Sequence, residues 1–166
     1  GTEGNVLPEL AFTQHYGESG KFIKTVRLQK GKNVLQVPEI HNLDVEKGGS
    51  IYVRYPNGNP SNNEVKIRVS GAKKIPHLNV YGDINDSSKE GEVKERIREY
   101  IRSLKDHVDT MKDDYPKLFA NKSNNKYKYD EKTSIVNTTD IETTKATLNL
   151  PASAILNGIT SGLATE

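Results

Sequence analysis

The stretch GGSIYVRYPNGNPSNNEVKIRVSGA, residues 48–72, predicts two strands and the loop that joins them. Apolar or aromatic side chains recur at every second position on both sides of a loop rich in Pro, Asn and Gly. They are Ile51, Val53 and Tyr55 before the loop and Val65, Ile67 and Val69 after it. Because successive side chains of a strand point to opposite faces, we expect an antiparallel pair with one buried and one solvated face.

Similar short segments lie on both sides of this stretch and are separated by Gly and Pro. We expect strands at residues 10–13, 22–28, 33–37, 50–55, 64–70 and 76–81. Short strands at regular spacing with turn residues between them are typical of a sandwich or a jelly roll. The sequence therefore predicts an antiparallel β-sandwich-like or jelly-roll-like subdomain over residues 1–84.

The apolar period changes after this region. Between Ser88 and Met111 the apolar side chains recur every three or four residues, which predicts a long amphipathic helix. Ser87 or Ser88 is the expected N-cap. Beyond Pro116 we expect a mixed segment, with strands near Ile135–Val136 and Leu148–Leu150 and a helix that begins at Pro151. The predicted class is α+β, with a helix-led second region over residues 85–166.

Charge and composition exclude several classes of protein and of site. The 24 basic and 22 acidic side chains are interspersed, and the net charge is only +2, so we expect no nucleic-acid partner. No stretch approaches the roughly 20 apolar residues that span a bilayer. The chain has no cysteine, which excludes disulfides and thiolate metal sites.

No local motif predicts catalysis or a bound metal. The four histidines do not form His-Glu-x-x-His, the spacing that places two zinc ligands and a general base on one helix face. We therefore predict no catalytic residue and no metal ligand in this chain. Asp83, Asp86 and Glu90 could coordinate calcium, but they lack the order of an EF-hand loop, and helix capping is the preferred interpretation.

Three tyrosines on or beside the predicted strands are candidates for binding carbohydrate. They are Tyr52, Tyr55 and Tyr81. An aromatic ring gives a sugar an apolar face to stack on, but tyrosines also fill the core and rim of a domain that lacks Trp. Both interpretations stay open at this point.

The order of several motifs resembles the M60-like (enhancin-type) zinc metallopeptidases. The matching pieces are VRLQKGKNV at 26–34, GGSIYVRY at 48–55, VKIRVSGA at 65–72, IPHL at 75–78, and the Thr-Thr-Asp, Leu-Asn-Leu and PASAIL motifs within 135–156. The resemblance covers roughly residues 10–160. It implies a β-rich portion that precedes a helical catalytic region carrying His-Glu-x-x-His and zinc, in secreted or surface enzymes that act on mucin-type glycoproteins.

Because the zinc motif is absent here, no catalytic residue is carried over from the family. The leading hypothesis is an N-terminal, non-catalytic portion of such a peptidase, whose partners are the downstream catalytic region and a mucin-type glycoprotein. The alternative is a stand-alone carbohydrate-binding or adhesion module of a bacterial surface protein.

Overall fold

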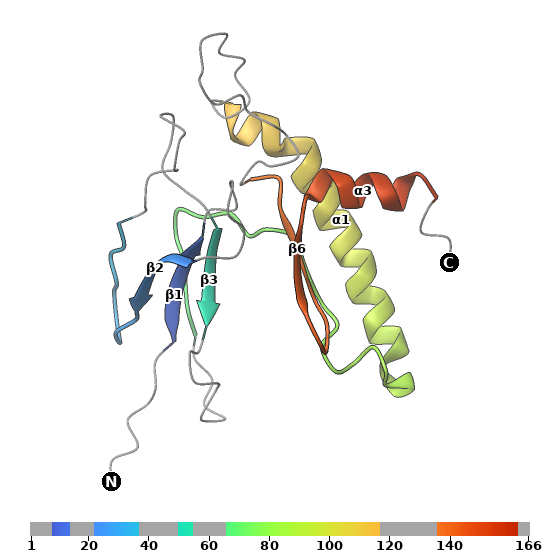
Figure 1. The fold of residues 1–166 in the computed structure, drawn as a ribbon, viewed down its shortest axis with the longest axis horizontal. Coiled ribbons are helices and arrows are strands. Elements are labelled where there is room, and N and C mark those ends of the chain that lie inside the picture. Colours follow the sequence, from blue (N-terminus) through green and yellow to red (C-terminus); the bar gives the residue numbers. More distant parts are fainter. Residues whose placement is uncertain (1–7, 14–21, 37–49, 55–65, 117–135, 163–166) are drawn as a thin grey trace. The chain divides into compact units, whose positions relative to one another are not determined.

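The structure is a computed structural model, and it describes residues 8–13, 22–36, 50–54, 66–116 and 136–162. The chain divides into two compact units, Gly1–Ala72 and Lys73–Glu166. Each unit contains a three-stranded sheet, and the helices belong to the second unit (Figure 1). The predicted α+β class with a sheet-rich N-terminal region is therefore confirmed.

The first unit is built on three antiparallel strands in the order β2-β1-β3. Their bounds are β1 Glu9–Thr13, β2 Phe22–Arg27 and β3 Ser50–Arg54. The central strand is buried on both faces, because its neighbouring side chains Leu10, Ala11 and Phe12 are all buried. Glu9 and Arg54 face each other across β1 and β3 and form an ion pair.

Two predicted strands of this unit are wrong in the residues that the structure describes. Residues 33–36 and 66–70 belong to no strand, and Val34 and Val69 are exposed. For the first segment the reason is local: the Asn33 side chain accepts from the Gln29 N–H at 3.0 Å and donates to its carbonyl at 2.9 Å. A turn of this kind takes the backbone away from a ladder. For 66–70, all five residues are exposed and no described strand pairs with them, so the face that the alternation predicted to be buried is not buried among the described residues.

The second unit has a mixed sheet in the order β4-β5-β6. The strands are β4 His77–Asn79, β5 Thr139–Glu142 and β6 Thr147–Leu150. Strands β4 and β5 are parallel, and β5 and β6 are antiparallel. The long helix α1 lies between β4 and β5 in the chain, which is the kind of connection that two parallel strands need.

Helix α1 spans Glu90–Asp114 and follows a short 3-10 turn at Ser87–Lys89. The predicted helix is confirmed, but the predicted cap is wrong. Asp86 is the capping residue of the 3-10 turn, and its carboxylate accepts from the Ser88 N–H at 3.0 Å. A carboxylate at the start of a helix satisfies free N–H groups and favours the positive end of the helix dipole.

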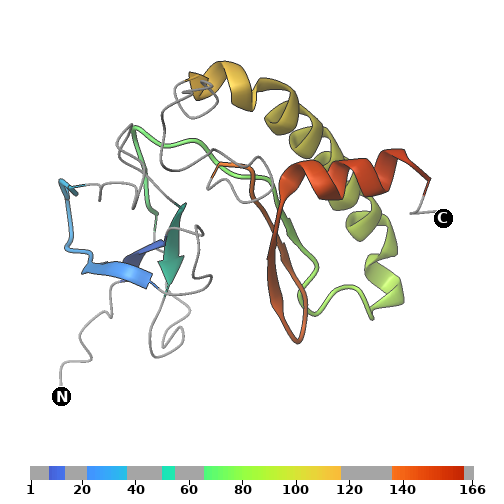
Figure 2. The ribbon, with the colours of Figure 1, turned by 45° about the horizontal axis from the view of Figure 1, so that its top comes forward.

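The core of the second unit lies where α1 and the second helix, α3 (Ala152–Thr160), cover one face of the sheet. Tyr100, Leu104 and Ala152 form its buried centre. Partly buried side chains from β4, β5, α1 and α3 surround this centre: Leu78, Ile101, Val108, Ile141, Ile155, Leu156 and Ile159. Figure 2 shows both helices on the same side of the strands. Four side chains of the apolar stripe predicted for α1 thus belong to this core: Tyr100, Ile101, Leu104 and Val108.

The predicted subdomains, 1–84 and 85–166, differ from these units because β4 pairs with β5 and belongs to the second unit. The predicted sandwich requires two packed sheets. The described residues of the first unit form one sheet. The sandwich and its assignment to residues 1–84 therefore stay predictions.

Candidate functional site

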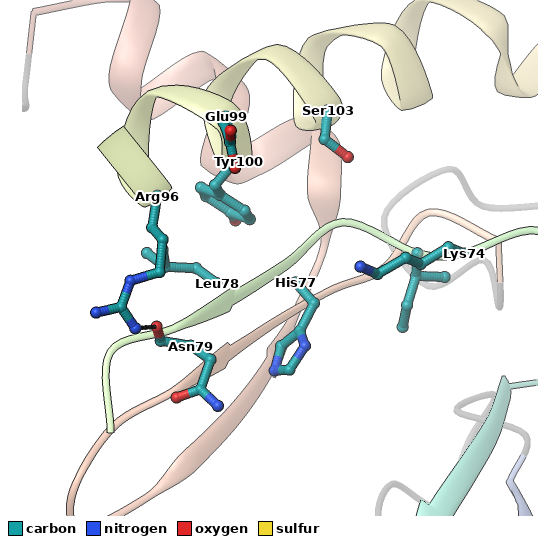
Figure 3. A pocket seen from close by; sticks show the side chains of 9 residues that line it. Lys74, His77, Leu78, Asn79, Arg96, Glu99, Tyr100 and Ser103 are labelled. Carbon is teal, nitrogen blue, oxygen red and sulfur yellow. Dashed lines mark hydrogen bonds between the residues drawn. The ribbon is translucent and has the colours of Figure 1, made fainter. Parts of the chain in front are cut away.

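The candidate site is an open hollow of about 400 Å³ between β4 and α1. Its lining residues are Lys74, Ile75, His77, Leu78, Asn79, Arg96, Glu99, Tyr100 and Ser103. Figure 3 shows the strand side chains on one wall and the helix side chains on the other. A volume of this size suits a small ligand or one or two side chains of a larger one.

The end of the hollow beside the turn after β4 is fixed by Arg96. Its guanidinium donates to the Asn79 carbonyl at 2.9 Å, the dashed line in Figure 3, and to Asp83 at 2.7 Å. Lys89 reaches the other oxygen of Asp83 at 2.7 Å. The hydrogen bonds from Lys89 and then Arg96 hold the pKa of Asp83 below its ordinary value. The turn after β4 is therefore tied to α1 by a charged, bidentate acceptor.

The strand wall carries a histidine–glutamate contact and one cation with no charged partner among the described residues. His77 Nε2 lies 3.2 Å from Glu142 Oε2 on the neighbouring strand. Lys74 is exposed and makes no ion pair with a described residue. Its neighbour Lys73, in contrast, is paired with Asp114 at the end of α1, and that hydrogen bond raises the pKa of Lys73. Adjacent lysines thus have different electrostatic surroundings.

A buried hydrogen-bond chain supports the floor of the hollow. The Thr139 hydroxyl donates to the Pro76 carbonyl at 2.8 Å, so the Tyr100 hydroxyl, 3.0 Å away, must be the donor to Thr139. Burial raises the pKa of Tyr100, which keeps the phenol in this donor form. These two hydrogen bonds link β4, α1 and β5 through one buried threonine, and they fix the height of the helix above the strand.

Asn137 has a comparable role at the start of α3. Its side-chain oxygen accepts from the Ser153 N–H at 2.9 Å, and its amide group donates to the Ser153 hydroxyl at 2.8 Å. Pro151, the residue before the helix, makes no side-chain capping bond, so a residue of a distant segment supplies it. Sequence analysis missed this role because Asn137 and Ser153 are 16 residues apart.

The three candidate tyrosines fall in different parts of the chain, and their role as glycan contacts stays a prediction. Tyr52 is half-buried on β3 in the first unit, and Tyr55 lies outside the described residues. Tyr81 follows β4 in the second unit and is 60% exposed. Its backbone N–H donates to the Asn79 side chain at 2.9 Å, so the turn that presents the ring is fixed beside the hollow.

The other sequence candidates have structural partners. Asp83 binds Lys89 and Arg96, Asp86 binds the Ser88 backbone, and Glu90 pairs with Lys94 along α1, which supports the capping interpretation over calcium binding. Among the described residues, no three His, Cys, Asp or Glu side chains gather as metal ligands would.

The remaining histidines fall in two groups. His15 and His41 lie outside the described residues. His107 is partly buried, and its Nε2 donates to the Val136 carbonyl at 2.7 Å. This bond holds α1 against the segment that leads to β5. In the described part of the chain, no helix is both long and apolar enough to cross a membrane.

The fold is similar to that of M60 metallopeptidases. ZmpB metallopeptidase from Clostridium perfringens matches with a TM-score of 0.62 and 21% identity over 97% of this chain and 27% of that chain. The M60 catalytic domain of Clostridium perfringens ZmpC, in complex with the sialyl T antigen, matches with a TM-score of 0.63 and the same identity and coverage. This chain therefore spans about a quarter of each. No protein-family model and no curated protein matches it.

Proposed function

We propose that this chain is the N-terminal, non-catalytic portion of a secreted M60-like zinc metallopeptidase that acts on mucin-type glycoproteins. The observation that carries the proposal is the fold similarity, which covers 97% of this chain but only 27% of the solved M60 chains. The ordered motifs support the same assignment. The rest of such an enzyme, including its zinc ligands, belongs to a region that would follow these residues.

In this proposal the second unit is a scaffold. The buried core around Leu104 and the bonds of Tyr100 and Asn137 hold α1, α3 and the sheet in one arrangement. The partner is the downstream catalytic region of the same protein, and the glycoprotein is its substrate. A zinc ion does not fit the described residues, which lack a converging set of ligands, so we derive no chemical step from them.

The decisive experiment is to sequence the coding DNA beyond the codon for Glu166. A His-Glu-x-x-His helix within the following few hundred residues is the expected result. The extended protein, expressed and incubated with mucin, should then cleave it, and removal of zinc by a chelator should abolish cleavage. The chain of 166 residues is the matched control and should be inactive with added zinc. A stop codon directly after Glu166, or mucin cleavage by the short chain, would contradict the proposal.

A second candidate function is a stand-alone carbohydrate-binding or adhesion module, with Tyr52, Tyr55 and Tyr81 as the glycan contacts. The exposed ring of Tyr81 on a fixed turn favours it, because a held aromatic surface suits sugar stacking. Titration with mucin glycans should show binding that Tyr81→Ala removes and Tyr81→Phe retains. A flat isotherm for the unmodified chain would exclude this function for those glycans.

A further inference from the structure

The outer edge of β4 presents backbone groups that no described strand uses. The Asp140 N–H donates to the Pro76 carbonyl at 3.0 Å, and the Val80 N–H donates to the Glu142 carbonyl at 2.9 Å. In a parallel pair both backbone groups of a residue face the same neighbour, and successive residues alternate in direction. The backbone groups of His77 and Asn79 therefore point away from β5. Arg96 binds the Asn79 carbonyl, which leaves the N–H and C=O of His77 and the N–H of Asn79 at this edge.

The hollow lies beside this same edge, since His77 and Asn79 both line it. An exposed strand edge is a template for another extended chain, and a neighbouring pocket gives such a chain side-chain specificity. The bond from Arg96 to Asn79 closes one end of the edge (Figure 3). The available length therefore suits a segment of only a few residues.

The charges of the hollow indicate which side chain fits. Lys74 lies on the strand wall without an ion pair to a described residue, whereas Lys73 is neutralised by Asp114. A carboxylate in the hollow would give Lys74 the partner that Lys73 already has. Glu99 lies on the opposite, helical wall and would repel a second carboxylate there. The complementary segment carries one acidic side chain, directed toward the strand wall.

We propose that the outer edge of β4 and the adjoining hollow bind a short extended peptide segment with one acidic side chain. The backbone of the segment pairs with His77 and Asn79, and its carboxylate reaches Lys74. This interaction is separate from the proposed peptidase activity, since it uses neither the predicted zinc region nor the candidate tyrosines. The partner is therefore a peptide recognised by its extended backbone and its charge.

The test is a titration of the isotopically labelled 166-residue chain, followed by amide NMR shifts. The probe is the acetylated and amidated peptide Thr-Val-Glu-Val-Thr. Two comparison peptides separate the two parts of the proposal: one has Lys in place of Glu, and one is methylated on alternate backbone nitrogens. The expected result is a shift of the His77 and Asn79 amides with the Glu peptide, and weaker binding of both comparison peptides.

Variants of the protein complete the test. Lys74→Glu should weaken binding of the Glu peptide by at least about fivefold, and Lys74→Gln should weaken it less. Lys145→Glu is the matched control, because Lys145 is exposed in the same unit and lies outside the hollow; binding should be unchanged. Equal binding of the methylated or Lys peptide, unchanged binding by Lys74→Glu, shifts confined to β6 or β2, or no binding at all would each overturn the proposal.

Discussion

The two units are built from short strands of similar length, yet they are stabilised differently. The core described in the first unit is one central strand, β1, buried between two others. In the second unit a 25-residue helix, a shorter helix and a sheet bury a shared cluster, and buried polar side chains join them. A helix satisfies its own backbone hydrogen bonds, whereas a strand must find a partner strand. The spacing of apolar residues therefore predicts the helical second unit more completely than it predicts the first unit, which is built on strands.

The largest expected effect comes from the centre of the second unit. Leu104 is fully buried on α1, so Leu104→Ala should lower the free energy of unfolding by about 2–5 kcal/mol through lost burial and a residual cavity. Urea unfolding followed by circular dichroism measures the loss. Leu148→Ala on β6 is the control, because that side chain is 44% exposed and should cost less than about 1 kcal/mol. Equal losses would mean that the described cluster is not the core.

A smaller loss of stability is expected at the start of α3, where the side chain of Asn137, from another segment, caps the helix. Asn137→Ala removes the acceptor of the Ser153 N–H and leaves this partly buried group unpaired, which should cost about 1–3 kcal/mol. Hydrogen exchange of the first amides of α3 should become faster in the variant. Asn157→Ala, at an exposed position of the same helix, should change neither quantity appreciably. Unchanged exchange in Asn137→Ala would show that α3 does not depend on this cap.

These cases show what the sequence can predict and what it cannot. The spacing of apolar residues located α1 because a helix is determined by neighbours three and four positions apart. Alternation at 66–70 predicted a strand but held no information on whether a partner strand would be adjacent. Roles that join distant segments, such as the bond from Asn137 to Ser153 and the hollow between β4 and α1, appear only when the fold is known.

A weaker contribution to stability, one that depends on pH, is expected from the turn after β4. Asp83→Asn removes the ion pairs with Lys89 and Arg96 and should lower stability at neutral pH. Because these partners lower the pKa of Asp83 on folding, its contribution is present above the unfolded-state pKa of about 3.9 and is lost as the pH falls through the lower folded-state value. The difference between variant and parent should therefore shrink below about pH 4.

Urea titrations at several pH values measure this difference. Added salt should also reduce it, since both ion pairs are partly exposed. Asp109→Asn, at an exposed position of α1, is the control and should cost less at neutral pH. A difference that persists unchanged at pH 3 would assign the effect of Asp83→Asn to lost hydrogen bonding in the turn instead of charge.

The smallest expected effect tests the first unit, where the sequence pattern and the structure disagree. Val69 is 49% exposed in a segment that belongs to no strand, so Val69→Thr should change stability by no more than about 0.5 kcal/mol. Val26→Thr is the matched change within β2, opposite the buried Leu10, and should cost more because it places a hydroxyl beside an apolar side chain. Urea unfolding compares the two variants directly. An equal or larger loss of stability for Val69→Thr would show that residues 66–70 are packed as a strand, as their alternation predicts. The first unit would then contain a further strand that pairs with these residues.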